Sequence, residues 1–151
     1  MSQLSAIQQA TTELVATATL SIPTEGPQLT EFTREASRFL ADAGANNGTL
    51  FAYLRHTSAS LLIQENAASA ARRDLEAYFS RIAPEDPALY THNDEGPDDM
   101  PAHLRSALTQ TQLSIPVGDG RMALGTWQGI YLFEHRREPS RRQIALHLLG
   151  A

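Results

Sequence analysis

Histidines are the residues of this chain best suited to bind a metal ion or transfer a proton near neutral pH. His92 and His103 enclose the loop HNDEGPDDMPAH, and His56 ends a strand-like run. His103 falls in the first turn of an expected helix, where the helix dipole favours a neutral ring. If His56 converges on His92 and His103, the three imidazoles would bind Zn²⁺, Mn²⁺ or a similar cation. For any one histidine, a hydrogen bond to the backbone is the commoner role.

Two carboxylates form a second group of candidates. Glu65 ends the next expected strand, and Asp74 lies in the helix that follows. Either side chain could act as a general base or orient a histidine. The alternative is an ion pair with Arg72 or Arg73, or simple solvation. The four acids of the histidine loop lack the spacing of an EF-hand and are expected to form turns and a helix cap.

A third group lies near the C-terminus. Trp127, the only tryptophan, precedes Gln128. An indole beside an amide could stack on a flat heterocycle and hydrogen-bond to it, although a core position is the commoner explanation for such a tryptophan. Four arginines flank the turn at Pro139, namely Arg136, Arg137, Arg141 and Arg142. They could bind a phosphate group or form a solvated hairpin tip.

The composition of the chain excludes several classes of protein and several kinds of site. The 151 residues predict one domain, 1–151, and the formal charge of −5 argues against a general nucleic-acid binder. The absence of cysteine excludes disulfides, thiolate metal sites and cysteine nucleophiles. No secretory signal and no apolar run of about 20 residues is present, so we expect a cytoplasmic protein with no membrane partner. There is no Walker loop, GxGxxG or GxSxG motif.

Hydrophobic periodicity predicts the elements that position these residues. Near-alternation predicts strands at residues 13–22, 49–56, 60–65, 112–117, 122–135 and 142–149, the second and third forming a hairpin across Thr57 and Ser58. Helical spacing predicts helices at 28–43, at 68–82 and from about Asp99, the last with Leu104, Ala107 and Leu108 facing inward. Without a regular βαβ rhythm, this order indicates an α+β fold, a sandwich-like pair of antiparallel sheets with flanking helices in a single compact domain.

Three blocks, taken together, resemble a known family. They are HTSASLLIQENA (56–67), HNDEGPDDMPAHLRSAL (92–108) and SIPVGDGRMALGTWQGIYLFEHR (114–136). The chain resembles the YjbQ-like family, described as secondary thiamine-phosphate synthases, over nearly its whole length. Those enzymes join hydroxymethylpyrimidine diphosphate to thiazole phosphate and release pyrophosphate.

The resemblance implies a homotrimer with a histidine-lined pocket that holds a divalent metal ion. His56, His92 and His103 would be the ligands, and such a set suits zinc better than manganese or magnesium. The expected catalytic residues are Glu65, Asp74 and His56, and the expected substrate-binding residues are Asn66, Trp127, Gln128 and Arg141. The synthase reaction would be a side activity of a metal-assisted site for a small phosphorylated substrate. The alternative is a non-catalytic trimer that binds a metal or small anion.

Overall fold

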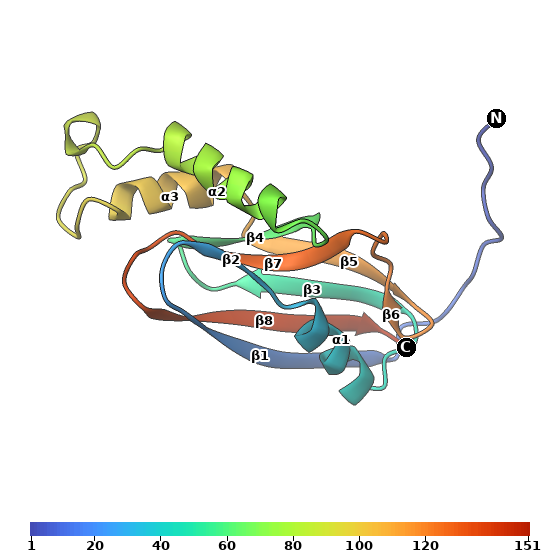
Figure 1. The fold of residues 1–151 in the computed structure, drawn as a ribbon. Coiled ribbons are helices and arrows are strands. Elements are labelled where there is room, and N and C mark those ends of the chain that lie inside the picture. Colours follow the sequence, from blue (N-terminus) through green and yellow to red (C-terminus); the bar gives the residue numbers. More distant parts are fainter.

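Two antiparallel sheets, stacked on each other, form the body of the molecule (Figure 1). The computed structural model describes residues 1–151. The five-stranded sheet has the order β1-β8-β3-β5-β6 and comprises Leu14–Thr24, Ser140–Gly150, Gly48–Leu54, Gln112–Gly118 and Arg121–Met122. The three-stranded sheet has the order β2-β7-β4 and comprises Gln28–Glu31, Gln128–Glu134 and Ala59–Glu65. The helices are α1 Thr33–Asp42, α2 Ser69–Ile82 and α3 Asp99–Leu108, with a short 3₁₀ turn at Pro87–Leu89. The predicted α+β fold is confirmed.

The main core lies between the two sheets, where each strand contributes every second residue. On β3 the buried set is Leu50, Ala52 and Leu54, as the alternation predicts. Other strands of both sheets, together with α1 and the residue before it, add further large buried side chains: Ile144, Leu146 and Leu148 of β8, Leu61 of β4, Ile130 and Leu132 of β7, Phe32 and Leu40. Burial of this apolar surface fixes the register of the larger sheet, because a one-residue slip would turn the buried side chains of β3 and β8 to the outer face.

The smaller sheet is covered on its other face as well. Tyr131 and Phe133 of β7 point away from the main core and pack against α2, where Phe79 meets the ring of Phe133 edge-on at 5.4 Å between centroids. In Figure 1, α2 and α3 lie together over this sheet. None of the three α-helices is long and apolar enough to cross a bilayer.

One predicted helix begins later than expected. Residues 28–43 divide into a strand and a shorter helix, because Gln28–Glu31 pairs with β7 and α1 starts only at Thr33. The Phe32 N–H donates to the Ile130 carbonyl at 2.9 Å, which continues the pairing up to the helix. Strand pairing satisfies backbone groups that the first turn of a helix would leave without partners.

Two strand predictions are right about where strands form but wrong about how the strands pair or continue. Strands 49–56 and 60–65 do not form a hairpin, since β3 pairs with β5 and β8 while β4 pairs with β7. The residues between β3 and β4, 55–58, are therefore a crossover between the sheets. The predicted strand 122–135 likewise divides into β6 and β7, which belong to different sheets. Alternation cannot reveal a change of sheet, because strands of both sheets bury alternate residues in the same core.

Candidate metal centre

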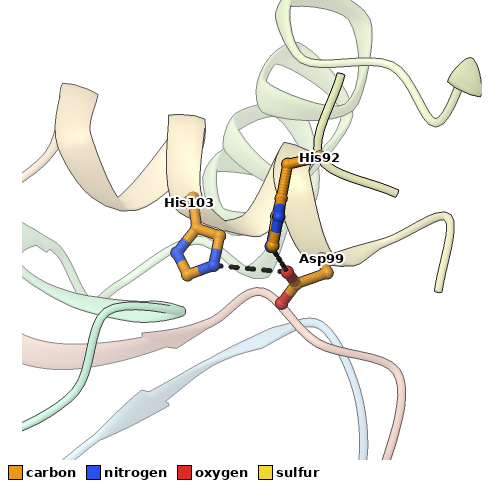
Figure 2. Close-up of side chains that lie close together, drawn as sticks. All are labelled: His92, Asp99 and His103. Atoms are coloured by element: carbon orange, nitrogen blue, oxygen red, sulfur yellow. Dashed lines mark hydrogen bonds and ion pairs between the residues drawn. The ribbon is translucent and has the colours of Figure 1, made fainter. Parts of the chain in front are cut away.

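Asp99 brings His92 and His103 together at the start of α3 (Figure 2). The Asp99 Oδ2 atom lies 3.0 Å from His92 Nε2 and 3.3 Å from His103 Nε2. The three ligand atoms all lie within 4.8 Å of one another. Asp99 and His103 are four residues apart on the helix, so they share one face, while His92 approaches from the loop. Because the His92 side chain is 44% exposed, its ring is free to adjust to a cation bound 2.0–2.2 Å from each ligand.

The backbone determines which nitrogen of His103 faces Asp99. His103 Nδ1 lies 2.9 Å from the Thr57 carbonyl oxygen, which can only accept, so Nδ1 carries the proton. In the neutral ring, Nε2 then presents a lone pair towards the Asp99 carboxylate. Two electron-rich atoms 3.3 Å apart repel unless a proton or a metal cation lies between them. Metal-bound histidines typically donate their other N–H to a carbonyl in this way.

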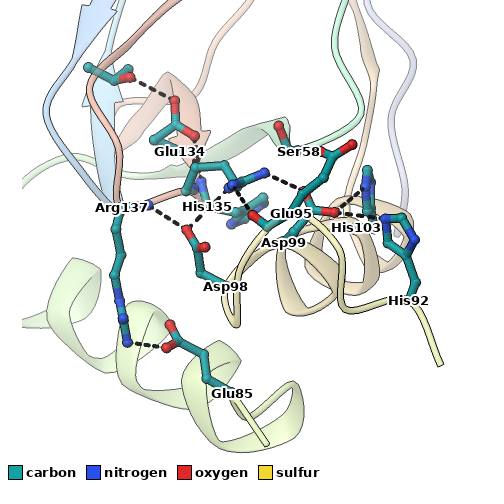
Figure 3. Close-up of polar contacts among 12 residues, drawn as sticks. Ser58, Glu85, His92, Glu95, Asp98, Asp99, His103, Glu134, His135 and Arg137 are labelled. Atoms are coloured by element: carbon teal, nitrogen blue, oxygen red, sulfur yellow. Dashed lines mark hydrogen bonds and ion pairs between the residues drawn. The ribbon is translucent and has the colours of Figure 1, made fainter. Parts of the chain in front are cut away.

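Arg136 neutralises the acidic start of α3. Its Nη1 donates to Asp99 Oδ1, and its Nε donates to Asp98 Oδ2 at 3.2 Å. The Arg137 N–H also donates to Asp98 Oδ2, at 2.9 Å (Figure 3). Burial alone raises the pKa of Asp98, but the Arg137 N–H and the Arg136 guanidinium outweigh it and hold that pKa below its usual range. Asp99, at 1% exposure, is thus a buried carboxylate with one oxygen paired to arginine and the other facing the two histidines.

The face of α3 that turns inward differs from the prediction. Leu104, Ala107 and Leu108 do not face the core, and Leu108 is 64% exposed. The buried side chains include Asp99 and Arg105, whose Nη2 donates to the Ala83 carbonyl at 2.7 Å. Asp99 and Arg105 are buried against an arginine and loop backbone respectively, where each charged group finds a partner.

His56 lies outside the group of three ligands. Its Nε2 accepts the Gln143 N–H at 2.9 Å, which uses the lone pair that a metal would need. Burial, followed by the nearby Arg142 guanidinium, lowers the pKa of His56, so the ring is neutral at pH 7. His56 and His103 nevertheless line one hollow of about 550 Å³ between the end of β3 and α3. A larger hollow, about 680 Å³, lies near residues 8–12 and contains no histidine.

The remaining histidines are away from this centre. His135, at 1% exposure, has its Nε2 2.8 Å from the Ser60 hydroxyl. His147 lies on β8 with its Nδ1 2.7 Å from the Thr17 hydroxyl. Both have the simple hydrogen-bonding role that is common for histidine.

A second expected group meets at the other end of the smaller sheet. Glu65 is the register partner of Gln128, and the Asn66 N–H donates to the Trp127 carbonyl at 3.0 Å. Trp127 is 64% exposed, so the interpretation of this indole as core is wrong. The length of β4 separates this group from His56–Ser58 by roughly 20 Å. Asp74 is exposed on α2.

The sequence-based prediction missed one candidate metal ligand, and it named Arg141 as a substrate-binding residue in place of its neighbour Arg142. Asp99 was expected only to cap a helix, although its four-residue spacing from His103 is a signal for paired ligands. Arg141 is exposed and its Nη1 lies 3.3 Å from the Ser21 hydroxyl, whereas Arg142 is buried and points inward. The signal was available, because Arg142 shares its strand parity with Ile144, Leu146 and Leu148.

Comparisons with known proteins place the chain in a family. Residues 18–151 match the model described as UPF0047 protein YjbQ-like. A UPF0047 protein of Synechocystis sp. is 46% identical over 131 residues, 87% of this chain and 89% of the relative. The UPF0047 protein YjbQ of Escherichia coli O157:H7 is 44% identical over 135 residues, covering 89% and 96%. A hypothetical protein from Aeropyrum pernix K1, with a solved structure, superposes with a TM-score of 0.82 at 29% identity, covering 90% of this chain and 99% of that one. The chain belongs to the YjbQ-like UPF0047 family.

Proposed function

We propose that this chain is a divalent-metal-dependent enzyme that acts on a small phosphorylated substrate. His92, Asp99 and His103 hold the metal ion, with zinc favoured over manganese or magnesium because two imidazoles and one carboxylate suit zinc. The observation that carries the proposal is the Nδ1–H of His103 bound to the Thr57 carbonyl, which leaves Nε2 directed at Asp99. When bound, the cation would act as a Lewis acid towards a phosphoryl oxygen or activate a water molecule.

The arginines support a phosphorylated substrate. A polar hollow of about 370 Å³, lined by Arg136 and Arg142 with Ser58 and Ser140, adjoins the centre, because Arg136 contacts both. Arginine side chains form charge-assisted hydrogen bonds to phosphate oxygens and stabilise a departing phosphate group. His103 is kept in the ligand tautomer by Thr57, and Arg136 pairs with the Asp99 carboxyl group beside it.

Thiamine-phosphate synthesis is the first reaction to test. It requires a cationic site for the departing pyrophosphate and a flat surface for the pyrimidine. The metal centre with its arginines supports the first requirement, and the exposed Trp127 beside Gln128 supports the second. These two groups lie roughly 20 Å apart along β4 in one chain. The proposed homotrimer would allow a neighbouring copy to supply the second group, including Glu65 and Asn66.

The alternative is a non-catalytic trimer that binds a metal ion or small anion at the same residues. It shares every contact of the metal centre and differs only in the absence of turnover. Elemental analysis and an activity assay on the same preparation therefore separate the two.

Replacement of His92 by alanine tests the centre with little risk to the fold, because this side chain is 44% exposed and bonds only to Asp99. We expect near-stoichiometric zinc or manganese in the untagged wild-type protein and its loss in His92→Ala. The fall in metal affinity should exceed the roughly 10–100-fold cost of losing an outer-shell partner. Release of pyrophosphate from the two thiamine precursors should fall with the metal content.

The matched control is His147→Ala, which removes a histidine from β8 that bonds only to Thr17. It should leave metal content and turnover unchanged. The proposed metal centre would be refuted if the wild-type protein contained no metal and took up neither zinc nor manganese on dialysis. Stoichiometric metal without turnover of any phosphorylated substrate would favour the non-catalytic alternative.

A further inference from the structure

Two hydrogen-bond donors face each other beside the metal centre. Because the Gln143 N–H donates to His56 Nε2, the neutral His56 ring carries its proton on Nδ1. Arg142 Nη1 lies 3.5 Å from that Nδ1 and can only donate. The two N–H groups therefore have no acceptor between them. An arrangement of this kind is stable when an external acceptor, preferably an anion, bonds to both.

A third donor lies next to them. Arg142 Nη2 donates to the Ser58 Oγ at 3.0 Å, so this hydroxyl accepts from arginine and keeps its own proton free to donate. His56 and Ser58 lie in the four-residue crossover between β3 and β4, on either side of Thr57, which binds His103. The same crossover thus contacts the metal ligand and supplies two donors.

Arg142 is held in place from behind by a buried carboxylate. Its Nε and Nη2 donate to Glu134 at 2.6 Å and 2.5 Å, and Glu134 is 0% exposed. This pairing fixes the guanidinium and leaves Nη1 as the end directed at His56. The Arg142 side chain is 6% exposed, so a hydrogen bond from it is protected from bulk water.

The adjoining polar hollow can admit an anion. Its lining contains no hydrophobic residue, and it reaches both Ser58 and Arg142. Two glutamates, Glu95 and Glu138, also line it, but both are exposed whereas Arg142 is buried. The buried end therefore presents arginine hydrogen-bond donors, with Glu134 balancing the charge of Arg142 from behind. The two exposed glutamates are screened by solvent and act on that end more weakly.

We propose that His56 Nδ1–H, Ser58 Oγ–H and Arg142 Nη1–H together bind one phosphate group of the substrate. His56 is then a substrate-binding donor and not a metal ligand. The inference rests on the proposed function for the kind of substrate, but the anion site itself exists whether or not the metal centre binds a cation.

The test is titration of inorganic phosphate into chelator-treated protein by calorimetry, with two substitutions of His56. His56→Gln keeps an acceptor near the position of Nε2 for the Gln143 N–H and removes the Nδ1 donor. His56→Asn keeps a donor near Nδ1 and removes the acceptor. We expect roughly tenfold weaker phosphate binding in His56→Gln and in Ser58→Ala, since each loses one hydrogen bond to an anion. His56→Asn should bind phosphate more tightly than His56→Gln.

A second readout comes from long-range ¹H–¹⁵N spectra, in which the His56 Nδ1 should be the protonated nitrogen and should shift on addition of phosphate. His147→Gln is the control and should bind phosphate like the wild type. Equal affinity in the wild type, His56→Gln and Ser58→Ala, or no phosphate binding by the wild type, would overturn the anion site. Phosphate binding that depends on His56 in a protein that takes up no metal would uphold the anion site while refuting the metal-dependent enzyme.

Discussion

Neighbouring residues Glu134 and His135 are both removed from solvent, but they are stabilised in different ways. Glu134 accepts hydrogen bonds from Arg142 and from the Thr24 hydroxyl at 2.7 Å. Burial alone raises the pKa of Glu134, and these donors together with a backbone N–H outweigh it and lower that pKa. His135 has only the Ser60 hydroxyl, and burial lowers its pKa from 6.5 to about 3. The fold therefore keeps one residue charged and the next one neutral.

His135 should make the native state sensitive to mild acid. At pH 7 the imidazole is neutral in both states, but below pH 6.5 the unfolded chain takes up a proton that the folded chain refuses until about pH 3. The free energy of unfolding should therefore fall by up to about 1.4 kcal/mol per pH unit between roughly pH 6 and pH 4.5. Urea titrations of chelator-treated wild type and His135→Gln should show this slope only in the wild type. Parallel pH profiles would contradict it.

Among individual residues, the sequence indicated the right types of side chain for the site, but in some places an adjacent residue was chosen in place of the one that lies in the site. His92 and His103 were chosen from their type and come together in the structure. Asp99 was missed as a ligand because a helix cap explains it as well, and the three-dimensional contacts show that it faces two imidazoles. Arg141 was chosen over Arg142, although the strand parity of Arg142 already indicates that its side chain turns inward.

At the scale of elements, β3 and β8 approach so closely that side chains are excluded where they pair. Gly48 lies opposite Gly150, and a Cβ on Gly48 would lie 2.2 Å from the Leu149 carbonyl oxygen. Gly48 also has a φ of +150°, which L residues rarely adopt. Gly44, just after α1, has a φ of +68° but open space around it.

These two glycines provide a matched pair of substitutions. Gly44→Ala should cost only the left-handed strain of roughly 1–2 kcal/mol. Gly48→Ala should destabilise the protein by about 3 kcal/mol or more, because a backbone oxygen cannot move aside without opening the sheet. Urea unfolding midpoints measure both. Similar midpoints for the two variants would show that β3 and β8 can separate without breaking their pairing.

The elements themselves were predictable where burial is periodic, as in β3 and β8. Sheet membership was not predictable, because the periodicity of a strand records only that one side is buried and not which strand lies next to it. Gln28–Glu31 shows the same limitation. This segment forms a strand because the edge of β7, which is far away in the sequence, is available to pair with it.

At the scale of the whole molecule, the residues expected to act together form two groups at opposite ends of the smaller sheet. If copies of the chain complete each other's sites, a His92→Ala chain and a Glu65→Gln chain should each be inactive but regain part of the activity when they are mixed, dissociated and reassembled. Light scattering should give three times the chain mass of 16.5 kDa. A monomeric mass, or no recovery in the mixture, would place all functional residues within one chain.

His56 and Thr57 belong to the crossover, residues 55–58, where the chain passes from one sheet to the other. His56 bonds to the backbone of β8 in the larger sheet, and Thr57 bonds to α3, which lies over the smaller one. A ligand bound in the neighbouring hollow would thus contact a segment that is bonded to both sheets. Its binding free energy would therefore add to the free energy of unfolding of the whole chain. At a hundred times its dissociation constant, a ligand adds about 2.7 kcal/mol to the free energy of unfolding. Any ligand that binds in this hollow should therefore raise the melting temperature of the protein, and screening for such a rise requires no activity assay.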